Sequence, residues 1–264
     1  MCGILGVGGD LLARDHNVFF DLLAVSWLRG HDSTGVYSAT KNGPGKMLKE
    51  ICSPTYYLAN FKERRQDVLN RWDTTLLLGH TRWATMGLVN KENAHPFYAG
   101  PYVGAHNGTL LEGEFWDFKI TDSELLFMKM ASTRDIVGTL KNLNPMSAFA
   151  VSVYEPGTKT LFLSRNTKRP LSFGFCNDRP VFYWASELGA LRYILDRNGI
   201  DSTICTIPAN KLWKIDMSKK FDFENVLEYD VTSPHKPYKI KEEENKSTVW
   251  DDIMDQSTNK VHVG

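Results

Sequence analysis

The chain starts with Met1-Cys2-Gly3-Ile4-Leu5-Gly6, and this stretch governs how the rest of the sequence is interpreted. Removal of Met1 would make Cys2 the first residue and give it both a thiol and a free α-amine. A thiolate is a strong nucleophile, and an α-amine with an ordinary pKa of about 7.7–8.0 can relay its proton near neutral pH. The stretch therefore predicts a nucleophile and its base on one residue. The alternative is a small apolar residue at the start of the buried strand expected over residues 2–9.

The composition limits the classes of function. A chain of 264 residues with 42% hydrophobic content can bury one large core. Lys+Arg and Asp+Glu both total 31, so no net field attracts nucleic acid or an anionic membrane. The sequence has neither a secretory signal nor the roughly 18 apolar residues that span a bilayer. The 4 cysteines are far apart, with no zinc-ligand spacing. We expect a soluble, cytoplasmic protein without a structural metal.

Apolar periodicity predicts a mixed α and β chain. Helices are expected over 17–28, 123–130 and 187–196. Strands are expected over 36–40, 74–80, 102–105, 148–154, 160–164, 172–176 and 181–185, with two more pieces within 204–215. The four strands between residues 148 and 185 are expected to be successive antiparallel neighbours.

The composition changes at Asp216, after which charged and polar residues dominate. Such a segment buries too little apolar surface to form its own core. The sequence therefore predicts a domain over residues 2–215 and a polar C-terminal extension over residues 216–264. The apolar segment 249–254 within this extension is expected to dock on the body of the domain or on a partner.

Six motifs follow one another along the chain. They are Met1-Cys2-Gly3-Ile4, Arg29-Gly30-His31-Asp32-Ser33-Thr34-Gly35, Gly79-His80-Thr81-Arg82-Trp83-Ala84-Thr85-Met86-Gly87, Asn93-Ala94-His95-Pro96-Phe97, His106-Asn107-Gly108 and Thr121-Asp122-Ser123-Glu124. Together they resemble the glutaminase domain of class II glutamine amidotransferases, which are N-terminal-nucleophile hydrolases. The resemblance covers about residues 2–215. It implies an α+β fold, a four-layer α/β/β/α sandwich of two antiparallel sheets flanked by helices.

The same resemblance implies a reaction. Cys2 would hydrolyse L-glutamine to glutamate and ammonia through a glutamyl thioester, and no cofactor would be required. Asn107 and the backbone N–H of Gly108 would form the oxyanion hole, although an Asn-Gly pair by itself favours a turn. Arg29 would help to hold the thiolate and to order the N-terminal strand, or would be only structural.

The substrate is a zwitterion, so its site needs a cation and an anion. The resemblance assigns Arg82 to the substrate carboxylate, for which a guanidinium offers a bidentate fork; the alternative is a surface arginine at a strand end. Asp122 is assigned to the substrate ammonium, although an aspartate there is also typical of a helix N-cap. Trp83 and Thr85 are expected to line the glutamine pocket. Met86 stands where the hexosamine-synthesising branch commonly has histidine, which argues against that branch.

Glutaminases of this family pass ammonia to a synthase. We therefore expect an acceptor partner protein, or self-association, in addition to L-glutamine itself. Two alternatives remain: a catalytically silent, glutaminase-like binding or scaffold protein, and an N-terminal-nucleophile amidase for another amide. The complete set of candidate site residues argues against a silent binding protein. The pair of Arg82 and Asp122 suits a free amino acid and therefore argues against an amidase for another amide.

Overall fold

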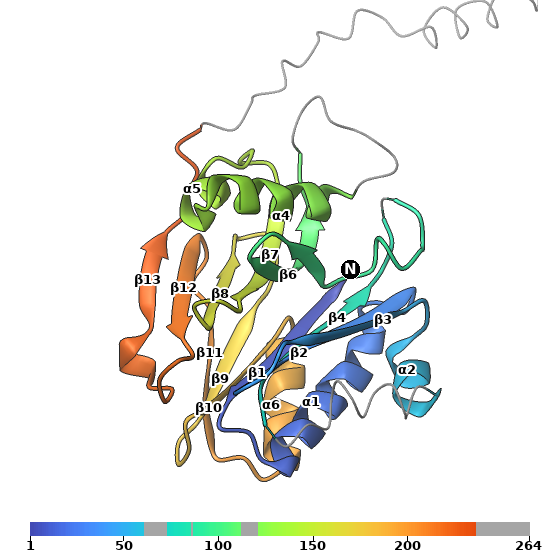
Figure 1. Ribbon diagram of the computed structural model, residues 1–264, viewed down its shortest axis with the longest axis vertical. Coiled ribbons are helices and arrows are strands. Elements are labelled where there is room, and N and C mark those ends of the chain that lie inside the picture. Colours follow the sequence, from blue (N-terminus) through green and yellow to red (C-terminus); the bar gives the residue numbers. More distant parts are fainter. Residues whose placement is uncertain (61–72, 86, 112–120, 236–264) are drawn as a thin grey trace, which may run out of the picture.

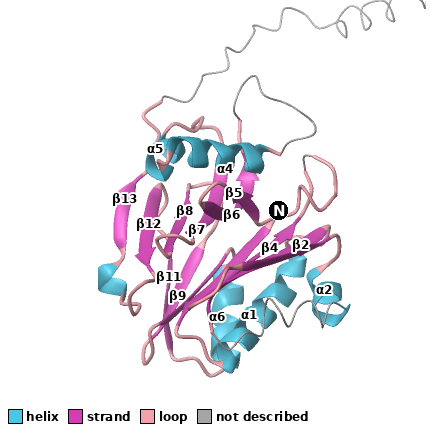
Figure 2. Cartoon of the chain, viewed as in Figure 1, coloured by secondary structure: helices cyan, strands magenta, loops and turns pink. Residues whose placement is uncertain are grey.

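The computed structural model describes residues 1–60, 73–85, 87–111 and 121–235. Met86 and the apolar segment 249–254 lie outside these ranges. The described strands form two sheets, in which all neighbouring strands are antiparallel. Helices cover the outer face of each sheet (Figures 1 and 2). The expected α+β class and the four-layer sandwich are confirmed.

The first sheet contains the start of the chain at its centre. Its strand order is β11-β9-β10-β1-β4-β2-β3. The bounds are β1 Gly3–Gly9, β2 Ser33–Thr40, β3 Lys46–Glu50, β4 Thr74–Arg82, β9 Ser172–Cys176, β10 Val181–Ala185 and β11 Ser202–Thr206. Its outer face carries α1 (Ala13–Val25), α2 (Pro54–Asn60) and α6 (Leu188–Arg197). The helix expected over 17–28 thus begins earlier, and its last turn is a short 3-10 helix, η1 (Ser26–Leu28).

The second sheet has the order β13-β12-β8-β7-β6-β5. Its strands are β5 Phe97–Ala99, β6 Tyr102–Thr109, β7 Ala148–Glu155, β8 Thr160–Arg165, β12 Lys211–Asp216 and β13 Leu227–Asp230. Two helices, α4 (Asp122–Thr133) and α5 (Ile136–Lys141), cover its outer face, and the 3-10 helix η2 (Phe223–Asn225) precedes β13. None of the helices in the described ranges is long and apolar enough to cross a membrane.

Alternating side chains divide the apolar residues among three cores. Leu5 and Val7 of β1 point outward to α1 and α6, whereas Ile4 points inward, between the sheets. Gly6 also faces inward, where a Cβ would collide with the indole of Trp184. Gly6, and Gly8 opposite Phe182, therefore make room for large aromatic side chains in the central core.

The strands between residues 148 and 185 depart from the prediction that they are successive neighbours. β7 pairs with β8 in the second sheet, whereas β9 pairs with β10 in the first. The prediction is wrong because each sheet has an apolar inner face, so an apolar run does not reveal which sheet it joins.

Residues 217–235, assigned by composition to the extension, pack against the body of the domain. Phe221 and Phe223 lie with ring centroids 5.8 and 6.2 Å from that of Phe173, and Val231 is buried. β13 adds a strand to β12 at the sheet edge.

Candidate active site

Cys2 lies directly before β1, and the strand register places it opposite Arg82. Gly3 pairs with Thr81 in the antiparallel ladder, so the next pair outward is Cys2 with Arg82. Ile4 and Leu78 belong to the core between the sheets. Because side chains alternate along a strand, Cys2 and Arg82 share this inner face.

The loop after β4 surrounds the Cys2 thiol. Sγ accepts a hydrogen bond from the Trp83 N–H at 3.4 Å and lies 3.6 Å from the Trp83 carbonyl oxygen, to which the thiol can donate. Burial raises the pKa of the Cys2 thiol, and the nearby charges of Arg82 and Arg29 counteract this rise. The nucleophile candidate is thus a partly buried thiol beside two guanidinium groups.

Arg29 holds the backbone of Cys2. Its Nε donates to the Cys2 carbonyl at 2.8 Å, and its Nη1 pairs with the carboxylate of Glu187. Ser186, next to Glu187, accepts a hydrogen bond from the Ile4 N–H at 2.9 Å. The start of α6 therefore fixes the start of β1. Glu187 lies 158 residues from Arg29, and no local pattern in the sequence indicates that the two residues meet.

Asp32 and Gly30 shape the loop that contains Trp83. The Asp32 N–H donates to the Arg82 carbonyl at 3.0 Å, and its carboxylate accepts from the Ala84 N–H at 2.7 Å. Gly30 passes so close to the end of β4 that a Cβ would lie 2.5 Å from the Arg82 carbonyl carbon. Asp32 received no role from the sequence, although it lies within the Arg-Gly-His-Asp motif.

Arg82 is 3% exposed, so the alternative of a surface arginine is wrong. Its Nη1 donates to the Leu88 carbonyl at 2.8 Å. Burial lowers the pKa of Arg82, and the charges of Cys2, Asp32 and Asp122 oppose that effect. These three groups therefore lie within electrostatic range of the Arg82 guanidinium.

The two residues expected to line the pocket differ in their surroundings. Trp83 is 45% exposed, and its ring meets that of His31 edge to face at 5.1 Å. Thr85 is exposed on the same loop, and no hydrogen bond within the described ranges joins it to the other candidates. The structure thus brings the Trp83 backbone to Cys2 but leaves Thr85 apart.

Asn107 and Gly108 lie inside β6, opposite Ala150 and Phe149, so the turn alternative is wrong. Ala105 belongs to the core between the sheets, and alternation places Asn107 on the same face. Asn107 is 1% exposed, and within the described residues its amide Nδ2 has no hydrogen-bond partner. A buried donor without a partner costs about 1–3 kcal/mol, which indicates a use for it other than stability.

Thr121, not Asp122, caps α4: its hydroxyl accepts from the Glu124 N–H at 3.2 Å. The alternative of Asp122 as N-cap is therefore wrong. The Asp122 carboxylate accepts from the N–H groups of Leu110 and Ser123, each at 2.9 Å. These bonds hold a negative charge between the end of β6 and the start of α4.

Three buried histidines join the sheets beside Cys2. His80, which pairs with Ile4, lies 3.2 Å through Nε2 from the His106 carbonyl oxygen, and its ring centroid is 4.1 Å from that of His95. Burial lowers the pKa of His80 to about 3 and that of His95 well below its ordinary value. Both are therefore neutral near pH 7, which supports a structural role for them. Within the described ranges, no cluster of His, Cys, Asp or Glu could hold a metal ion.

The chain is similar in sequence to known proteins. No model of a protein family matches it. The glutamine–fructose-6-phosphate aminotransferase (isomerizing) of Listeria monocytogenes is 30% identical over 191 residues, which are 66% of this chain and 30% of that protein. The enzyme of the same name from Mesorhizobium japonicum is 27% identical over 197 residues, with the same coverage of 66% and 30%. The chain thus matches less than a third of the length of these curated relatives.

Solved structures share the fold. Glutamine phosphoribosylpyrophosphate amidotransferase from B. subtilis matches with a TM-score of 0.64 and 21% identity over 88% of this chain and 49% of that one. A glutamine aminotransferase class-II domain protein from Silicibacter pomeroyi matches with a TM-score of 0.53 and 15% identity, over 88% of this chain and 100% of that one. With its ordered motifs and these curated relatives, the chain belongs to the class II glutamine amidotransferases, and its sandwich of two antiparallel sheets has the fold of the N-terminal-nucleophile hydrolases.

Proposed function

We propose that Cys2, after removal of Met1, hydrolyses the side-chain amide of L-glutamine to glutamate and ammonia. One observation carries the proposal: Cys2 and Arg82 lie opposite each other on the inner face of one sheet, and the unpartnered amide of Asn107 faces the same layer from the other sheet. Met1 is 60% exposed, which suits its removal by an aminopeptidase.

Substrate binding follows from the charges at this end of the sandwich. The guanidinium of Arg82 would take the α-carboxylate of glutamine as a bidentate partner. Asp122, whose carboxylate is oriented by two backbone N–H groups, has lone pairs left for the α-ammonium. Trp83 and Thr85 would border the substrate on the side of the loop. The paired charges favour a free amino acid over other amides.

In the first chemical step, Sγ of Cys2 attacks the amide carbon while the α-amine takes the thiol proton. The oxyanion would be stabilised by Nδ2 of Asn107 and the N–H of Gly108. The C–N bond then breaks, the proton passes from the amine to the departing ammonia, and a thioester remains. Water attacks the thioester, the amine accepts the water proton, and glutamate leaves as the thiol is restored.

Removal of Met1 affects both the α-amine and the thiol of Cys2. With Met1 attached, the nitrogen of Cys2 is an amide and cannot act as a base. Removal creates a free α-amine beside the thiol, and once this amine has taken the thiol proton its positive charge favours the thiolate. The burial that raises the pKa of the Cys2 thiol would then be opposed by this charge in addition to Arg82 and Arg29.

Covalent labelling tests the nucleophile directly. The purified chain is incubated with the glutamine analogue 6-diazo-5-oxo-L-norleucine, followed by intact mass and peptide mapping. We expect one adduct, on a Cys2 that lacks Met1, and none on Cys205, a partly buried free cysteine that serves as an internal control. Cys2→Ala should remove both the adduct and ammonia release. A processed chain that binds glutamine without labelling or turnover would instead establish the silent binding protein.

The ammonia needs an acceptor. The match covers only 30% of the length of the curated relatives, so we propose that the acceptor site lies outside the matched region, on a synthase partner or on another part of an assembly. Their name includes fructose 6-phosphate, which makes a sugar phosphate the first acceptor to test, although Met86 argues against that branch. Full glutaminase activity in a strictly monomeric chain, measured by size exclusion at the assay concentration, would refute an obligatory partner.

A further inference from the structure

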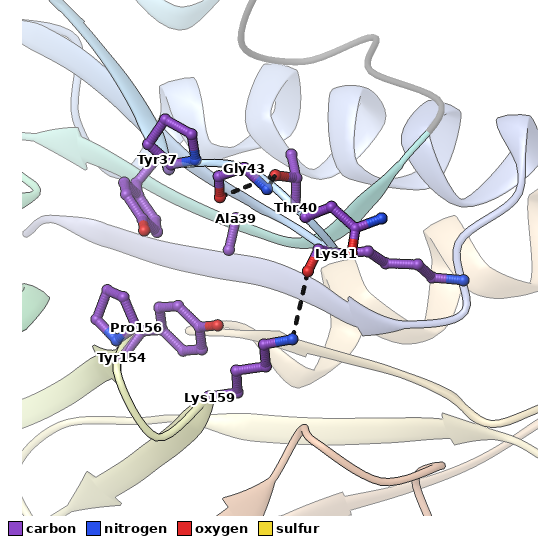
Figure 3. Close-up of a pocket in the computed structure, with 11 residues that line it drawn as sticks. Tyr37, Ala39, Thr40, Lys41, Gly43, Tyr154, Pro156 and Lys159 are labelled. Carbon is purple, nitrogen blue, oxygen red and sulfur yellow. Dashed lines mark hydrogen bonds between the residues drawn. The ribbon is translucent and has the colours of Figure 1, made fainter.

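A hollow lies at the end of the sandwich that is away from Cys2. β1 and β2 both run antiparallel to β4, so they point in the same direction, with Cys2 before the start of β1 and the hollow at the end of β2. β1 has 7 residues, so the two places are roughly 23 Å apart along the strand. The cavity has a volume of about 290 Å³, and its lining includes Tyr37, Thr40, Lys41, Gly43, Tyr154 and Lys159 (Figure 3).

Two buried tyrosines reach this hollow from different sheets. Tyr37 of β2 is 1% exposed and Tyr154 of β7 is 3% exposed, with ring centroids 6.1 Å apart. Neither hydroxyl has a hydrogen-bond partner within the described residues. Burial raises the pKa of Tyr154 to about 12 and also raises that of Tyr37, so both hydroxyls remain protonated donors at neutral pH. Two hydroxyls of largely buried tyrosines, without a described protein partner, therefore line one cavity.

Lysines supply positive charge at the same place. Nζ of Lys159 donates to the Lys41 carbonyl at 3.3 Å, and no described carboxylate forms an ion pair with Lys159. Lys159 has a φ of 52°, a left-handed conformation that is uncommon for lysine, in the turn between β7 and β8. Lys41 lies 3.6 Å from Asp10. The lining itself contains two lysines and no aspartate or glutamate.

A neighbouring hollow extends the positive surface. It has a volume of about 470 Å³ and shares Lys41, Asn42 and Lys159 with the first. Its lining adds Lys219 and Lys220, together with two carboxylates that already pair with lysines. A group bound in the first hollow therefore has room to carry an organic substituent into the second.

These groups select for one kind of ligand. The Lys159 ammonium matches an anion, and this ammonium with the two phenolic hydroxyls matches a group that has several acceptor oxygens. The Lys41 ammonium, which lies 3.6 Å from a carboxylate oxygen of Asp10, stands on the side of the neighbouring hollow. A carboxylate has two oxygens for these donors, whereas a phosphate group has at least three and a larger charge. We propose that the hollow formed by Tyr37, Lys41, Tyr154 and Lys159 binds a phosphate-bearing anion, at a site separate from Cys2.

Binding is tested with the full chain by isothermal titration at constant ionic strength, with inorganic phosphate in one arm and sn-glycerol 3-phosphate in the other. We expect saturable binding of one anion per chain, and none with chloride. Tighter binding of the ester would identify an organic phosphate as the ligand, and equal binding would identify free phosphate. Absence of saturable binding in both arms would overturn the proposal.

Variants locate the bound anion. Lys159→Met removes the charge and keeps the length of the side chain, and Tyr154→Phe removes one hydroxyl with little change in packing. Each should weaken binding about tenfold, the loss typical of a charge-assisted or buried hydrogen bond. Lys168→Met is the matched control, because Lys168 also donates to backbone carbonyls but lies outside both hollows. Unchanged affinity in Lys159→Met and Tyr154→Phe, or an equal loss in Lys168→Met, would refute this placement.

Discussion

Gly30→Ala tests whether the geometry around Cys2 depends on the close approach of two backbones. A Cβ at Gly30 would lie 2.5 Å from the Arg82 carbonyl carbon and 2.7 Å from the Thr81 oxygen, whereas ordinary contact begins at 3.4 Å. The loop and the end of β4 must then separate by about 0.9 Å. Such overpacking costs about 1–3 kcal/mol of stability, and a displacement near 1 Å of a substrate-positioning residue costs about 100-fold in rate.

We therefore expect Gly30→Ala to lower kcat/KM for glutamine hydrolysis about 100-fold, measured by coupled ammonia release. Urea unfolding should show the loss of about 1–3 kcal/mol. Gly189→Ala in α6 is the control, because no atom lies within 4 Å of its added Cβ. It should keep the wild-type rate and gain about 0.5–1 kcal/mol. A stability loss in Gly30→Ala without any change in kcat/KM would refute the link between Gly30 and the placement of Arg82.

Three other substitutions probe separate contacts. Asp15 is fully buried and bound by Arg179 through two bonds of 2.8 Å, so Asp15→Asn should cost about 3–5 kcal/mol in urea unfolding at pH 7. Burial alone would raise the pKa of Asp15, but its hydrogen bonds, above all those from Arg179, lower this pKa below its ordinary value. The contribution of the Asp15 carboxylate to folding stability is therefore complete above the unfolded-state pKa of about 3.9 and is lost as pH falls through the folded-state pKa. A constant difference between variant and wild type down to pH 2, which lies well below about 3.9, would contradict this. Glu187→Gln should lower kcat about tenfold at unchanged KM, because Arg29 loses its ion pair with Glu187. It should also shift the pH profile of Cys2 thiol alkylation. An unchanged kcat and an unchanged profile would disprove that Glu187 positions Arg29 against Cys2. Asn107→Ala should lower kcat about 10²–10³-fold without a loss of urea stability, and a rise in KM alone would argue against an oxyanion role.

Much of the fold was predictable because apolar runs bounded by turn residues mark the strands in the local sequence. The runs 148–154, 160–164, 172–176 and 181–185 coincide closely with β7, β8, β9 and β10. The register that places Cys2 opposite Arg82, however, depends on which strands pair, and only the family resemblance indicated that the two residues meet. Periodicity reveals the face of a strand but not its neighbour.

The missed residues share a physical cause. Glu187 fixes Arg29 across 158 positions of sequence, and nothing in the local pattern of either residue reveals the other. Asp32 acts through the backbone of Ala84, which again depends on how two loops meet. Asn107-Gly108 was assigned to the oxyanion hole through the resemblance alone, because the pair favours a turn in isolation and only pairing with β7 extends it into a strand. Tertiary contacts outweigh local preference at each of these positions.

The central place of β1 also has a consequence during synthesis. β1 lies between β4 and β10, so the strand that follows Cys2 lacks one of its two neighbours until Val181–Ala185 has been made. At ribosomal rates of about 5–20 residues per second, residues 10–180 between β1 and β10 take roughly 9–34 s to translate. The topology therefore keeps the N-terminus incompletely folded while the chain grows, and under the proposed mechanism this interval would let an aminopeptidase reach Met1 before the first sheet closes around Cys2.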